Sequence, residues 1–467
     1  MVQSPIQTEI NYYQEETNSL VEALEGLPNS AAEAIVDNNF ITTSFLNALG
    51  FSLQERIPQF NTGHGRQQVD YALRHNSNKD NFLLSKVNPH VLVELKGRDI
   101  DLSPNSGSYK STVKQIKRYL LAPNCKSVQW GIITNSKHIQ LFRKHSKVIY
   151  PATPCLEITS DNIVQLTYQI RKKLEHTIKA LTVAVYNNKG GVGKTTTVIN
   201  LAAVLTRHKK KVLIVDFDPN QQDLTNSLGI EIGEESLYQC LKDRTNTLNL
   251  KDAIVSYTKK FRNNVSLSFD VLPVDKQLAQ INEDDLRKEF SFYSFSKKLE
   301  PLKADYDYIL IDAPPNWRFF SISAVYASDV VLIPTKHNNI FSLQNAAVTI
   351  RQYIPEVQKI RQEKTKKIEW GSTALPIFFN GEKIADAARI RATKAIKTII
   401  KQVYQEYSFD LTPYFFPNYK SRNNTRIFEL PSNAYIGYAA FDKIPAAYKN
   451  RTAYSYYTEL AKEYFLQ

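Results

Sequence analysis

The sequence predicts an α/β protein of two domains: an αβ domain over residues 1–177, and a domain over 178–467 with a mostly parallel sheet flanked by helices. Apolar runs of strand length alternate along the chain with segments whose apolar residues have helical spacing. A glycine-rich loop at 189–197 joins one such run to such a helix. The length of 467 residues also exceeds what one core usually holds, about 250 to 300 residues.

The first domain should contain both helices and strands. Its expected elements are helices capped by Ser30 and by Thr42 or Thr43, strands at 67–73, 90–96 and 127–133, and an amphipathic helix at 161–176. Alternation along 91–96 places Glu94 and Lys96 on one strand face and Val93 and Leu95 on the other. Asp70 alternates likewise with its apolar neighbours. An acid and a lysine therefore share a surface, with a second acid on a nearby strand.

These polar residues form a candidate catalytic site. Asp70 and Glu94 are hard oxygen ligands that suit Mg²⁺, or Mn²⁺ in its place. Lys96 would orient a water or stabilise the pentavalent phosphate during cleavage of a nucleic-acid backbone. The plain alternative for Glu94 and Lys96 is a surface salt bridge.

The surroundings of this set resemble the PD-(D/E)xK restriction-endonuclease fold, and more particularly the N-terminal nuclease domain of type I restriction motor subunits, over about residues 20–150. The matching features are Glu33 in the leading helix, the run Leu46–Phe51, Gln115 and Tyr119 four residues apart, and Gly131–Asn135 followed by a strand at 138–143. The resemblance implies catalytic roles for Asp70, Glu94 and Lys96 and supporting roles for Glu33, Gln115 and Tyr119. Val69 stands where the motif name has proline, and Ser30 with Glu33 is also a possible capping box.

The loop Lys-Gly-Gly-Val-Gly-Lys-Thr-Thr-Thr at 189–197 follows an expected strand at 181–186 and opens a helix. Glycines let backbone N–H groups close around phosphate oxygens, and the helix N-terminus adds its dipole. Lys194 would reach the β and γ phosphates, and Thr195 would offer its hydroxyl to Mg²⁺. The expected ATP-binding residues of the loop are Lys189, Gly190, Gly191, Val192, Gly193, Lys194, Thr195 and Thr196.

Acidic residues end two further expected strands, at 211–216 and 308–312. Open α/β sheets place ligands at such strand ends. Asp312 and Asp216 are therefore expected near the metal with Thr195, and Asp218 near the attacking water. For each aspartate alone, a turn before proline is the simpler explanation.

From about residue 180 to the C-terminus the chain resembles the ParA/MinD family of deviant Walker ATPases. The matching pieces are KGGVGKTTT, VDFDP, YDYILIDAPP and VVLIPT at 330–335. The resemblance implies a P-loop NTPase fold and an ATP-dependent homodimer in which Lys189 reaches the partner's phosphates. It gives Asp218 the role of positioning water, and Asn380, after an expected strand at 375–379, a contact with adenine. The chain has one residue more than the usual switch segment before Thr225.

Charge points to a polyanionic partner. The net charge is +13 with a pI near 9.3, and most of the excess lies after residue 177. Family members that act on chromosomes or plasmids bind DNA through a basic surface near the C-terminal part. The candidate DNA-binding residues are Arg391, Lys394, Lys397 and Lys401 on one helix face, with Lys420, Arg422 and Arg426 nearby. An ordinary solvated helix face is the alternative.

The cysteine content and the absence of long apolar runs indicate the cellular compartment of the protein. The three cysteines, Cys125, Cys155 and Cys240, are widely spaced and suggest neither disulfides nor a zinc site. No basic-plus-apolar leader and no run of roughly 20 apolar residues occurs. We therefore expect a cytoplasmic protein without a membrane partner.

The leading hypothesis is an ATP-dependent, DNA-associated enzyme in which a ParA-like dimer controls a Mg²⁺-dependent endonuclease. The alternative is a plasmid or chromosome partition-type ATPase whose first domain binds DNA or a partner, such as a DNA-bound adaptor protein, without cleaving. A metabolic ATPase related to electron-transfer reductases ranks last, because the cysteines lack the placement for a bridging iron–sulfur cluster.

Overall fold

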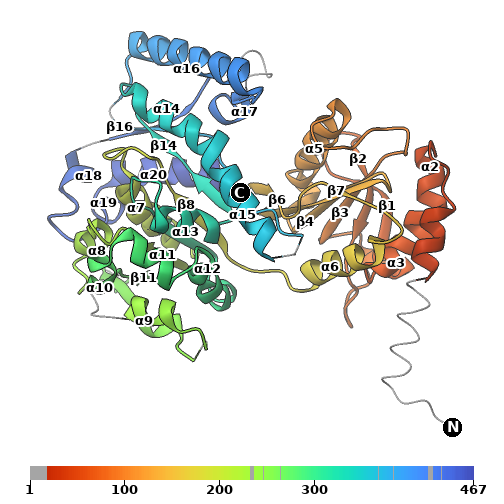
Figure 1. The fold of residues 1–467 in the computed structure, drawn as a ribbon, viewed down its shortest axis with the longest axis horizontal. Coiled ribbons are helices and arrows are strands. Elements are labelled where there is room, and N and C mark those ends of the chain that lie inside the picture. Colours follow the sequence, from red (N-terminus) through yellow and green to blue (C-terminus); the bar gives the residue numbers. More distant parts are fainter. Residues whose placement is uncertain are drawn as a thin grey trace. The chain divides into compact units, whose positions relative to one another are not determined.

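The computed structural model describes residues 18–231, 236–245, 247–262, 264–365, 368–381, 383–418, 424–432 and 434–467. The chain divides into two compact units (Figure 1). Unit 1 comprises 1–177 with 366–370 and 467, and unit 2 comprises 178–365 with 371–466. No helix in the described part of the chain is long and apolar enough to cross a bilayer.

Unit 1 is built on a mixed sheet of seven strands. Its order is β1-β2-β3-β4-β5-β6, with β7 paired to β5. The strands are β1 (Arg56–Asn61), β2 (Gln68–Leu73), β3 (Val91–Leu95), β4 (Trp130–Thr134), β5 (His138–His145), β6 (Val148–Pro151) and β7 (Leu156–Glu157). β1, β2 and β3 form an antiparallel meander, whereas β4 runs parallel to β3 after the crossover helix α5 (Gly107–Leu120). The three expected strands of this unit are confirmed to within three residues.

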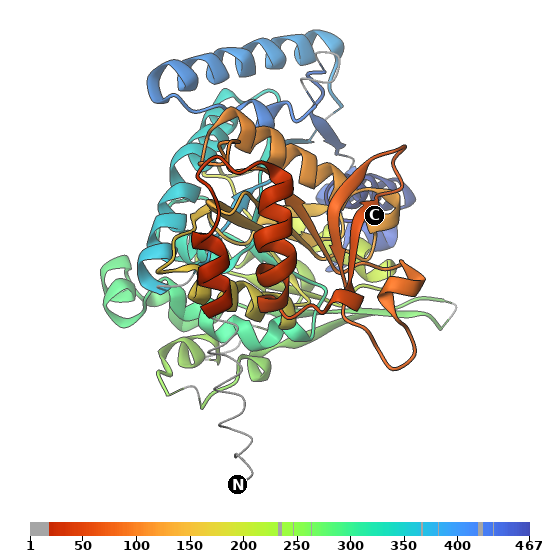
Figure 2. The same ribbon diagram turned by 90° about the vertical axis from the view of Figure 1, so that its right-hand side faces the viewer.

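Helices cover both faces of this sheet. The helix at 18–25, the helical run 33–48 and α6 (Ile163–Glu175) pack on the face that carries Val93 and Leu95. Figure 2 shows the two N-terminal helical segments, in red, nearest the viewer. α5 packs on the opposite face, against Leu92 and Val69, together with α4 (Phe82–Ser85). The expected alternation along β3 is therefore confirmed, as is the helix at 161–176.

The N-terminal helices begin differently from the prediction. One continuous helical run comprises α2 (Glu33–Val36), the π-helical η1 (Asp37–Phe45) and α3 (Leu46–Ala48). Its N-cap is Ala32, which makes no side-chain cap bond, so the expected caps at Ser30 and at Thr42 or Thr43 are wrong. The Thr42 hydroxyl instead donates to Asp37 Oδ1 at 3.1 Å, and Tyr71 donates to the same oxygen. The five-residue spacing of Asp37 and Thr42 matches a π-helical turn.

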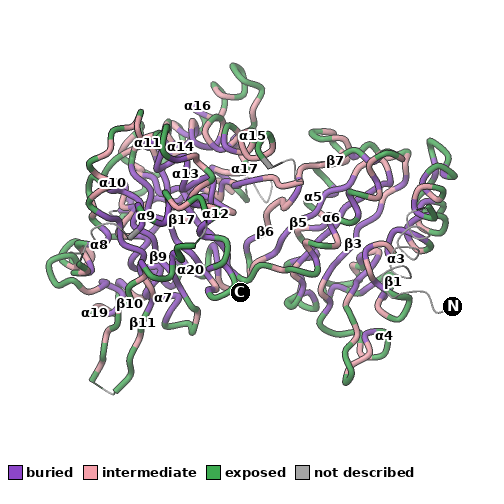
Figure 3. The backbone as a smooth tube through the Cα atoms, turned by 60° about the horizontal axis from the view of Figure 1, so that its bottom comes forward, coloured by how far each residue is buried: buried purple, intermediate pink, exposed green. Residues whose placement is uncertain are grey.

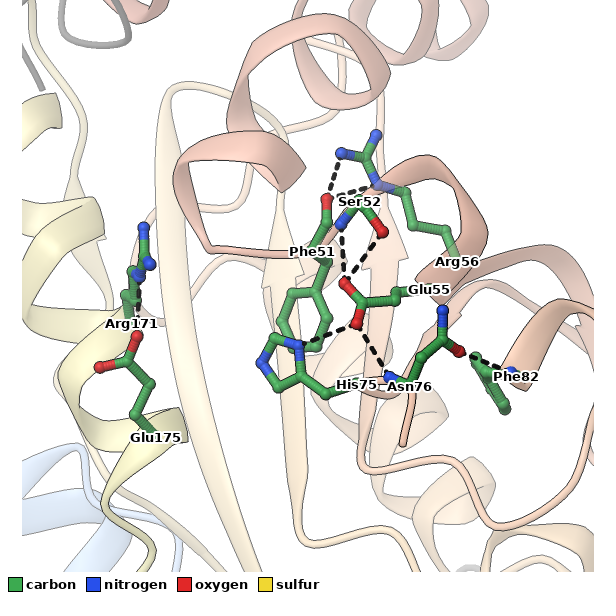
Figure 4. A network of polar contacts seen from close by, with 9 residues as sticks. All are labelled: Phe51, Ser52, Glu55, Arg56, His75, Asn76, Phe82, Arg171 and Glu175. Carbon is green, nitrogen blue, oxygen red and sulfur yellow. Dashed lines mark hydrogen bonds and ion pairs between the residues drawn. The ribbon is translucent and has the colours of Figure 1, made fainter. Parts of the chain in front are cut away.

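A polar network ties the start of β1 to the end of β2 (Figure 4). Glu55, at the end of the 3₁₀ turn η2 (Leu53–Glu55), accepts from Ser52 N and Oγ at 3.0 Å each and from Asn76 N at 2.8 Å. Burial opposes ionisation of Glu55, but these hydrogen bonds outweigh it and lower the pKa of its carboxyl. Arg56 is buried and donates to the carbonyl of Phe51. The network holds the segment before β1 next to the segment after β2, and β2 is the strand that carries Asp70.

Unit 2 holds a seven-stranded sheet of order β10-β11-β9-β12-β8-β13-β15. Its strands are β8 (Leu181–Val185), β9 (Val212–Asp216), β10 (Val255–Lys260), β11 (Ser266–Leu272), β12 (Tyr308–Asp312), β13 (Val330–Leu332) and β15 (Thr373–Ala374). All pairs are parallel except the hairpin of β10 with β11. The central strands are buried throughout (Figure 3), as expected for a parallel sheet covered on both faces. The expected strands at 181–186, 211–216 and 308–312 are confirmed.

Helices surround the unit 2 sheet. They are α7 (Lys194–Arg207), α8 (Asp223–Leu228), α9 (Ser236–Lys242), η4 (Leu250–Ala253), α10 (Lys276–Gln280), α11 (Glu283–Glu289), α12 (Tyr293–Leu299), η5 (Glu300–Ala304), α13 (Phe319–Ala327), α14 (Ile340–Val348), η6 (Thr349–Tyr353), α15 (Ile354–Thr365), α16 (Asp386–Tyr407), α17 (Thr412–Phe415), α18 (Ala434–Tyr438), α19 (Ala446–Lys449) and α20 (Arg451–Tyr464). α7 packs on β9 and β12 and against α20, while α13 packs against α12 and α15.

A small parallel sheet of order β14-β16-β17 lies beside these helices in unit 2. It contains β14 (Pro334–Thr335), β16 (Phe378–Gly381) and β17 (Phe428–Pro431). The expected strand at 375–379 is therefore wrong in its bounds, because the chain leaves the large sheet after β15 and enters the small one at β16. Pro376 lies between them and has no N–H to continue a ladder.

Candidate functional site

The loop at 189–197 has the conformation of an anion site. It connects β8 to α7, and Gly191 and Gly193 adopt φ values of 73° and 82°, which favour glycine. Gly193 is the N-cap of α7 and offers no side-chain acceptor to the N–H groups of the first helical turn. These N–H groups and the positive end of the helix dipole are therefore available to phosphate oxygens.

Lys194 lies at the centre of this site. Its side chain is only 8% exposed, and the neighbouring charges are those of Asp312 and Asp218. Burial lowers the pKa of the Lys194 ammonium, and the two carboxylates oppose that shift. Lys194 Nζ lies 3.5 Å from the carbonyl oxygen of Lys189, which is itself half-buried at the start of the loop. The ammonium is thus held under the loop, with carboxylates as its counter-ions.

Asp312 and Thr195 are brought together at the end of β12. The Thr195 side chain hydrogen-bonds to the Asp312 carboxylate, whose Oδ1 is buried without a partner. Burial raises the pKa of Asp312, and the negative charge of Asp216 adds to this effect. A buried carboxylate oxygen without a donor, beside a threonine hydroxyl and a phosphate loop, has the chemistry of a Mg²⁺ site.

Asp216 has a different environment from Asp312. Its Oδ2 accepts from Thr225 Oγ1 at 2.6 Å and from Thr225 N at 3.0 Å. Burial raises the pKa of Asp216 to about 6 although these bonds favour the ionised form. Asp216 therefore anchors the start of α8, and its expected approach to the metal stays a prediction.

The segment between Asp218 and Thr225 contains a turn that leads into α8. Gln222 N donates to the carbonyl of Asp218 at 2.9 Å, and Gln222 adopts a left-handed φ of 53° directly before α8. Asp218 Oδ1 accepts from Gln221 N at 3.3 Å. Burial raises the pKa of Asp218 against these backbone bonds. The positive charge of Lys194 also acts on this carboxylate and lowers its pKa, and the expected role of Asp218 at the attacking water stays a prediction.

Two asparagine amides donate hydrogen bonds at the loop and next to it. Asn380, in β16, donates from Nδ2 to the carbonyls of Val192 and Gly193 at 2.9 and 3.3 Å. Asn187, fully buried after β8, donates to the carbonyls of Pro334 and Ser342 at 2.9 and 3.1 Å. The expected contact of Asn380 with adenine stays a prediction, while its amide binds the loop itself. Sequence reasoning missed Asn187, whose place between the strand and the loop was the one signal that could have found it.

We predict that Asn380→Ala weakens ATP binding by about tenfold, because two loop carbonyls lose their donor and the loop loses its rigid support. Titration with a fluorescent ATP analogue measures the effect. Gln405→Ala, an exposed amide on α16, is the matched control and should leave the affinity unchanged. Equal affinities for wild type and Asn380→Ala would contradict the supporting role.

The acids of unit 1 meet where β2 and β3 separate. The two strands pair from Leu73 with Val91 to Tyr71 with Val93, and the next residues in this register are Asp70 and Glu94. Pairing stops there, and Asp70 Oδ2 accepts from Leu95 N at 2.6 Å instead. The strand ends thus open around the two carboxylates.

Lys96 and Glu33 complete this cluster. Lys96 Nζ lies 2.6 Å from Glu94 Oε1 and 3.8 Å from Glu33 Oε2. Burial and the charge of Asp70 raise the pKa of Glu94 to about 7, against the effect of Lys96. The Glu94 side chain is 3% exposed, and its Oε2 is buried without a partner. The salt bridge between Glu94 and Lys96, which was the alternative to a catalytic role, is present. It leaves the second oxygen of the Glu94 carboxylate without a hydrogen-bond partner. We call Glu33, Asp70, Glu94 and Lys96 the acidic cluster.

The three residues with expected supporting roles, Glu33, Gln115 and Tyr119, lie on two helices of unit 1. Glu33 is the first residue of α2, which begins without a side-chain cap, so the capping-box explanation of Glu33 is wrong. Gln115 Nε2 donates to Tyr119 Oη at 3.0 Å, so this pair forms on α5 as its spacing requires. Tyr119 is buried in the core between α5 and the sheet. Among the residues described, no three His, Cys, Asp or Glu side chains are arranged as a metal cage.

The basic face of α16 is exposed. Arg391, Lys394, Lys397 and Lys401 are exposed, while Ile396 and Ile399 are buried on the other side. A cavity of about 460 Å³ adjoins this face and is lined by Lys397, Lys401, Tyr404 and Phe416, among others. Arg426 is also exposed; Lys420 and Arg422 lie outside the described residues. Cys125, Cys155 and Cys240 are free thiols.

Known proteins are similar to part of this chain. A family model described as an AAA domain matches residues 180–370. The chain is 38% identical over 156 residues to the sporulation initiation inhibitor protein Soj of Bacillus subtilis, covering 33% of this chain and 57% of Soj. It is 35% identical over 154 residues to the chromosome partitioning protein ParA of Myxococcus xanthus, covering 32% and 50%. The chain thus spans about half the length of the curated relatives it matches.

Solved structures that match part of the chain include apo McdA from Cyanthece, with a TM-score of 0.43 and 22% identity over 61% of this chain and 98% of that one. Another is the septum site-determining protein MinD from Pyrococcus horikoshii, with a TM-score of 0.38 and 20% identity over 60% and 93%. The matched region contains the phosphate loop, β9 and β12 with their aspartates, and β13. Residues 180–370 are therefore similar to an AAA domain, and part of the chain is similar in sequence to Soj and ParA.

Proposed function

We propose that the protein is an ATP-dependent, DNA-associated enzyme in which the ParA-like unit dimerises on ATP, binds DNA and controls a Mg²⁺-dependent endonuclease in unit 1. The observation that carries the nuclease part is the acidic cluster. Asp70 and Glu94 face each other where β2 and β3 separate, with Lys96 and Glu33 within ion-pair distance of each other. A protein that only bound a partner would not need a buried carboxylate, a half-buried carboxylate and a lysine at one strand end.

The strand order of unit 1 supports the same proposal. An antiparallel meander of three strands, followed by a helix and a strand parallel to the third, places Asp70 on the second strand and Glu94 on the third. Gln115 and Tyr119 then lie on the crossover helix α5, on the sheet face next to Glu94.

The acidic cluster fits a divalent metal ion. Asp70 and Glu94 would hold the ion, because the buried Glu94 Oε2 has no donor and two adjacent carboxylates suit a hard cation. A bound Mg²⁺ would supply Lewis-acid activation of the phosphodiester. Lys96, now the counter-ion of Glu94, would contact the phosphate being cleaved, and Glu33 would hold the Lys96 ammonium in place.

Unit 2 would act as the switch. Lys194 and the N–H groups of α7 would bind the β and γ phosphates, and Thr195 with Asp312 would hold Mg²⁺. Asp218 would position the attacking water. Lys189 would reach the phosphates of a second subunit, so that ATP joins two chains and brings two nuclease units to one duplex. The exposed face of α16 would hold DNA phosphates.

The second candidate is a partition-type ATPase whose unit 1 binds DNA or an adaptor protein without cleaving. The name of the Myxococcus xanthus relative, a chromosome partitioning protein, favours it. This candidate shares the ATP site and the DNA-binding face with the first. The partition-type candidate differs from the first in giving the acidic cluster no catalytic role.

Incubation with supercoiled plasmid separates the two candidates. With Mg²⁺ or Mn²⁺ we expect nicking by wild type and at least about 100-fold slower nicking by Glu94→Ala and by Lys96→Ala, since each removes a group that would contact the metal or the phosphate. Glu25→Ala, an exposed acid on the helix at 18–25, is the control and should nick like wild type. No nicking by wild type with any nucleotide would favour the partition-type protein.

A further inference from the structure

The crossover helix α5 carries an exposed basic stripe. Lys110, Lys114 and Arg118 are exposed and follow one another at intervals of four residues, hence on one side of the helix. The 14 residues of α5 include no aspartate or glutamate, and none of the three cations takes part in an ion pair among the described residues. A stripe of one sign without acidic partners differs from an ordinary solvated helix face, on which both signs usually alternate.

The spacing of the stripe suits a polyanion with regular charges. Four residues of α-helix rise about 6 Å, so the three cations extend over about 12 Å. A duplex presents phosphates of both strands along its axis at a mean of about 1.7 Å per charge. A stripe of this length can therefore contact several phosphates of a duplex.

The stripe belongs to the same side of unit 1 as the acidic cluster. Ile116 and Leu120, on the inner side of α5, pack in one core with Leu92 of β3. Glu94 is two residues beyond Leu92 on β3 and therefore emerges on that sheet face. DNA that reached Glu94 from this face would pass α5.

We propose that Lys110, Lys114 and Arg118 bind the phosphate backbone of duplex DNA and hold it beside the acidic cluster. The proposal rests on the proposed function in taking DNA as the partner of unit 1. It is independent of cleavage and of the face on α16, so the binding should be measurable without any divalent cation.

Anisotropy of a fluorescent 30-bp duplex with the full chain, in EDTA and without nucleotide, tests the proposal. Lys110→Glu with Lys114→Glu should weaken binding at least about tenfold and lower the slope of log K against log salt by about 2, the loss of two phosphate contacts. Lys79→Glu with Lys86→Glu, an exposed pair in the segment around α4, makes the same change in net charge and should have less than a twofold effect. Arg118 stays unchanged because it also contacts the Tyr119 ring.

The same two pairs are also introduced together with Lys397→Glu and Lys401→Glu, which disable the face on α16. We expect the effect of the Lys110 and Lys114 pair to persist in that background, with an unchanged unfolding temperature. Equal effects of the two pairs, an unchanged salt slope, or preference for anionic lipid vesicles over the duplex would overturn the proposal. If wild type binds DNA through α5 but does not nick plasmid, the proposal for α5 still holds, and the proposed endonuclease activity is refuted.

Discussion

Lys194→Ala is expected to weaken ATP binding by at least about 100-fold, equivalent to about 2.7 kcal/mol. The Lys194 ammonium is nearly buried under the loop and faces Asp312 and Asp218. Without it, two buried carboxylates would face the triphosphate with no cation between them, in surroundings that screen charge poorly. Titration with a fluorescent ATP analogue, with and without Mg²⁺, measures the loss.

Lys297→Ala is the matched control for this change. Lys297 is an exposed lysine on α12, so its removal should leave ATP affinity as it is. The carboxylates of Asp312 and Asp218 would also lose a buried counter-ion in Lys194→Ala, so the unfolding temperature is recorded in the same preparation. Retention of ATP affinity within threefold by a folded Lys194→Ala protein would contradict the assignment of the site.

Lys189→Ala is expected to separate ATP binding from dimerisation. Lys189 begins the loop, and its carbonyl, rather than its side chain, is the group that Lys194 contacts. Removal of the side chain should therefore change ATP affinity by less than about threefold. A second subunit's phosphates would lose their cation, so the ATP-dependent dimer should weaken by at least about tenfold.

Sedimentation velocity with ATP and Mg²⁺ measures this second effect. Wild type should sediment as a dimer with ATP and as a monomer with ADP, and Lys189→Ala as a monomer with both. Lys194→Ala serves as a comparison, because it should lose the dimer by losing ATP. If Lys189→Ala still dimerises with ATP, the cross-subunit role of Lys189 is wrong.

The nucleotide site was the most predictable part of the fold. Its strands β8, β9 and β12 are continuous apolar runs that lie side by side in the sheet, so their polar ends converge. Asp312 and Thr195 meet as their positions at a strand end and a helix start require. Asn380 could not be placed in the same way, because its contact with the loop depends on a separate sheet that begins after Pro376.

The acidic cluster was predictable in its residues but not in its geometry. Alternation put Glu94 and Lys96 on one face of β3, and this face is now known to be shared with α5. The separation of β2 from β3 at Asp70 depends on where pairing stops, which no local pattern encodes. The predicted helix caps were wrong for a related reason. A π-helical segment, in which Thr42 and Tyr71 donate hydrogen bonds to Asp37, joins the two helices that the sequence predicted into one.

The sequence contains four basic residues between Lys110 and Arg118, and three of them, Lys110, Lys114 and Arg118, are the exposed cations of α5. Their significance depends on tertiary structure. Only the packing of Ile116 and Leu120 on the sheet places these cations outward and on the side of Glu94. A charge run therefore becomes a candidate binding surface only when the fold shows which face is covered.

The central claim is that the ATP state of unit 2 controls cleavage by unit 1, and the nucleotide dependence of plasmid nicking tests it most directly. Nicking of supercoiled plasmid is timed in Mg²⁺ with ATP, with ADP and without nucleotide, for wild type and Lys189→Ala. We predict that ATP changes the wild-type rate by at least about tenfold, and that Lys189→Ala nicks at one rate under all three conditions. Equal wild-type rates with ATP, with ADP and without nucleotide would contradict the claim.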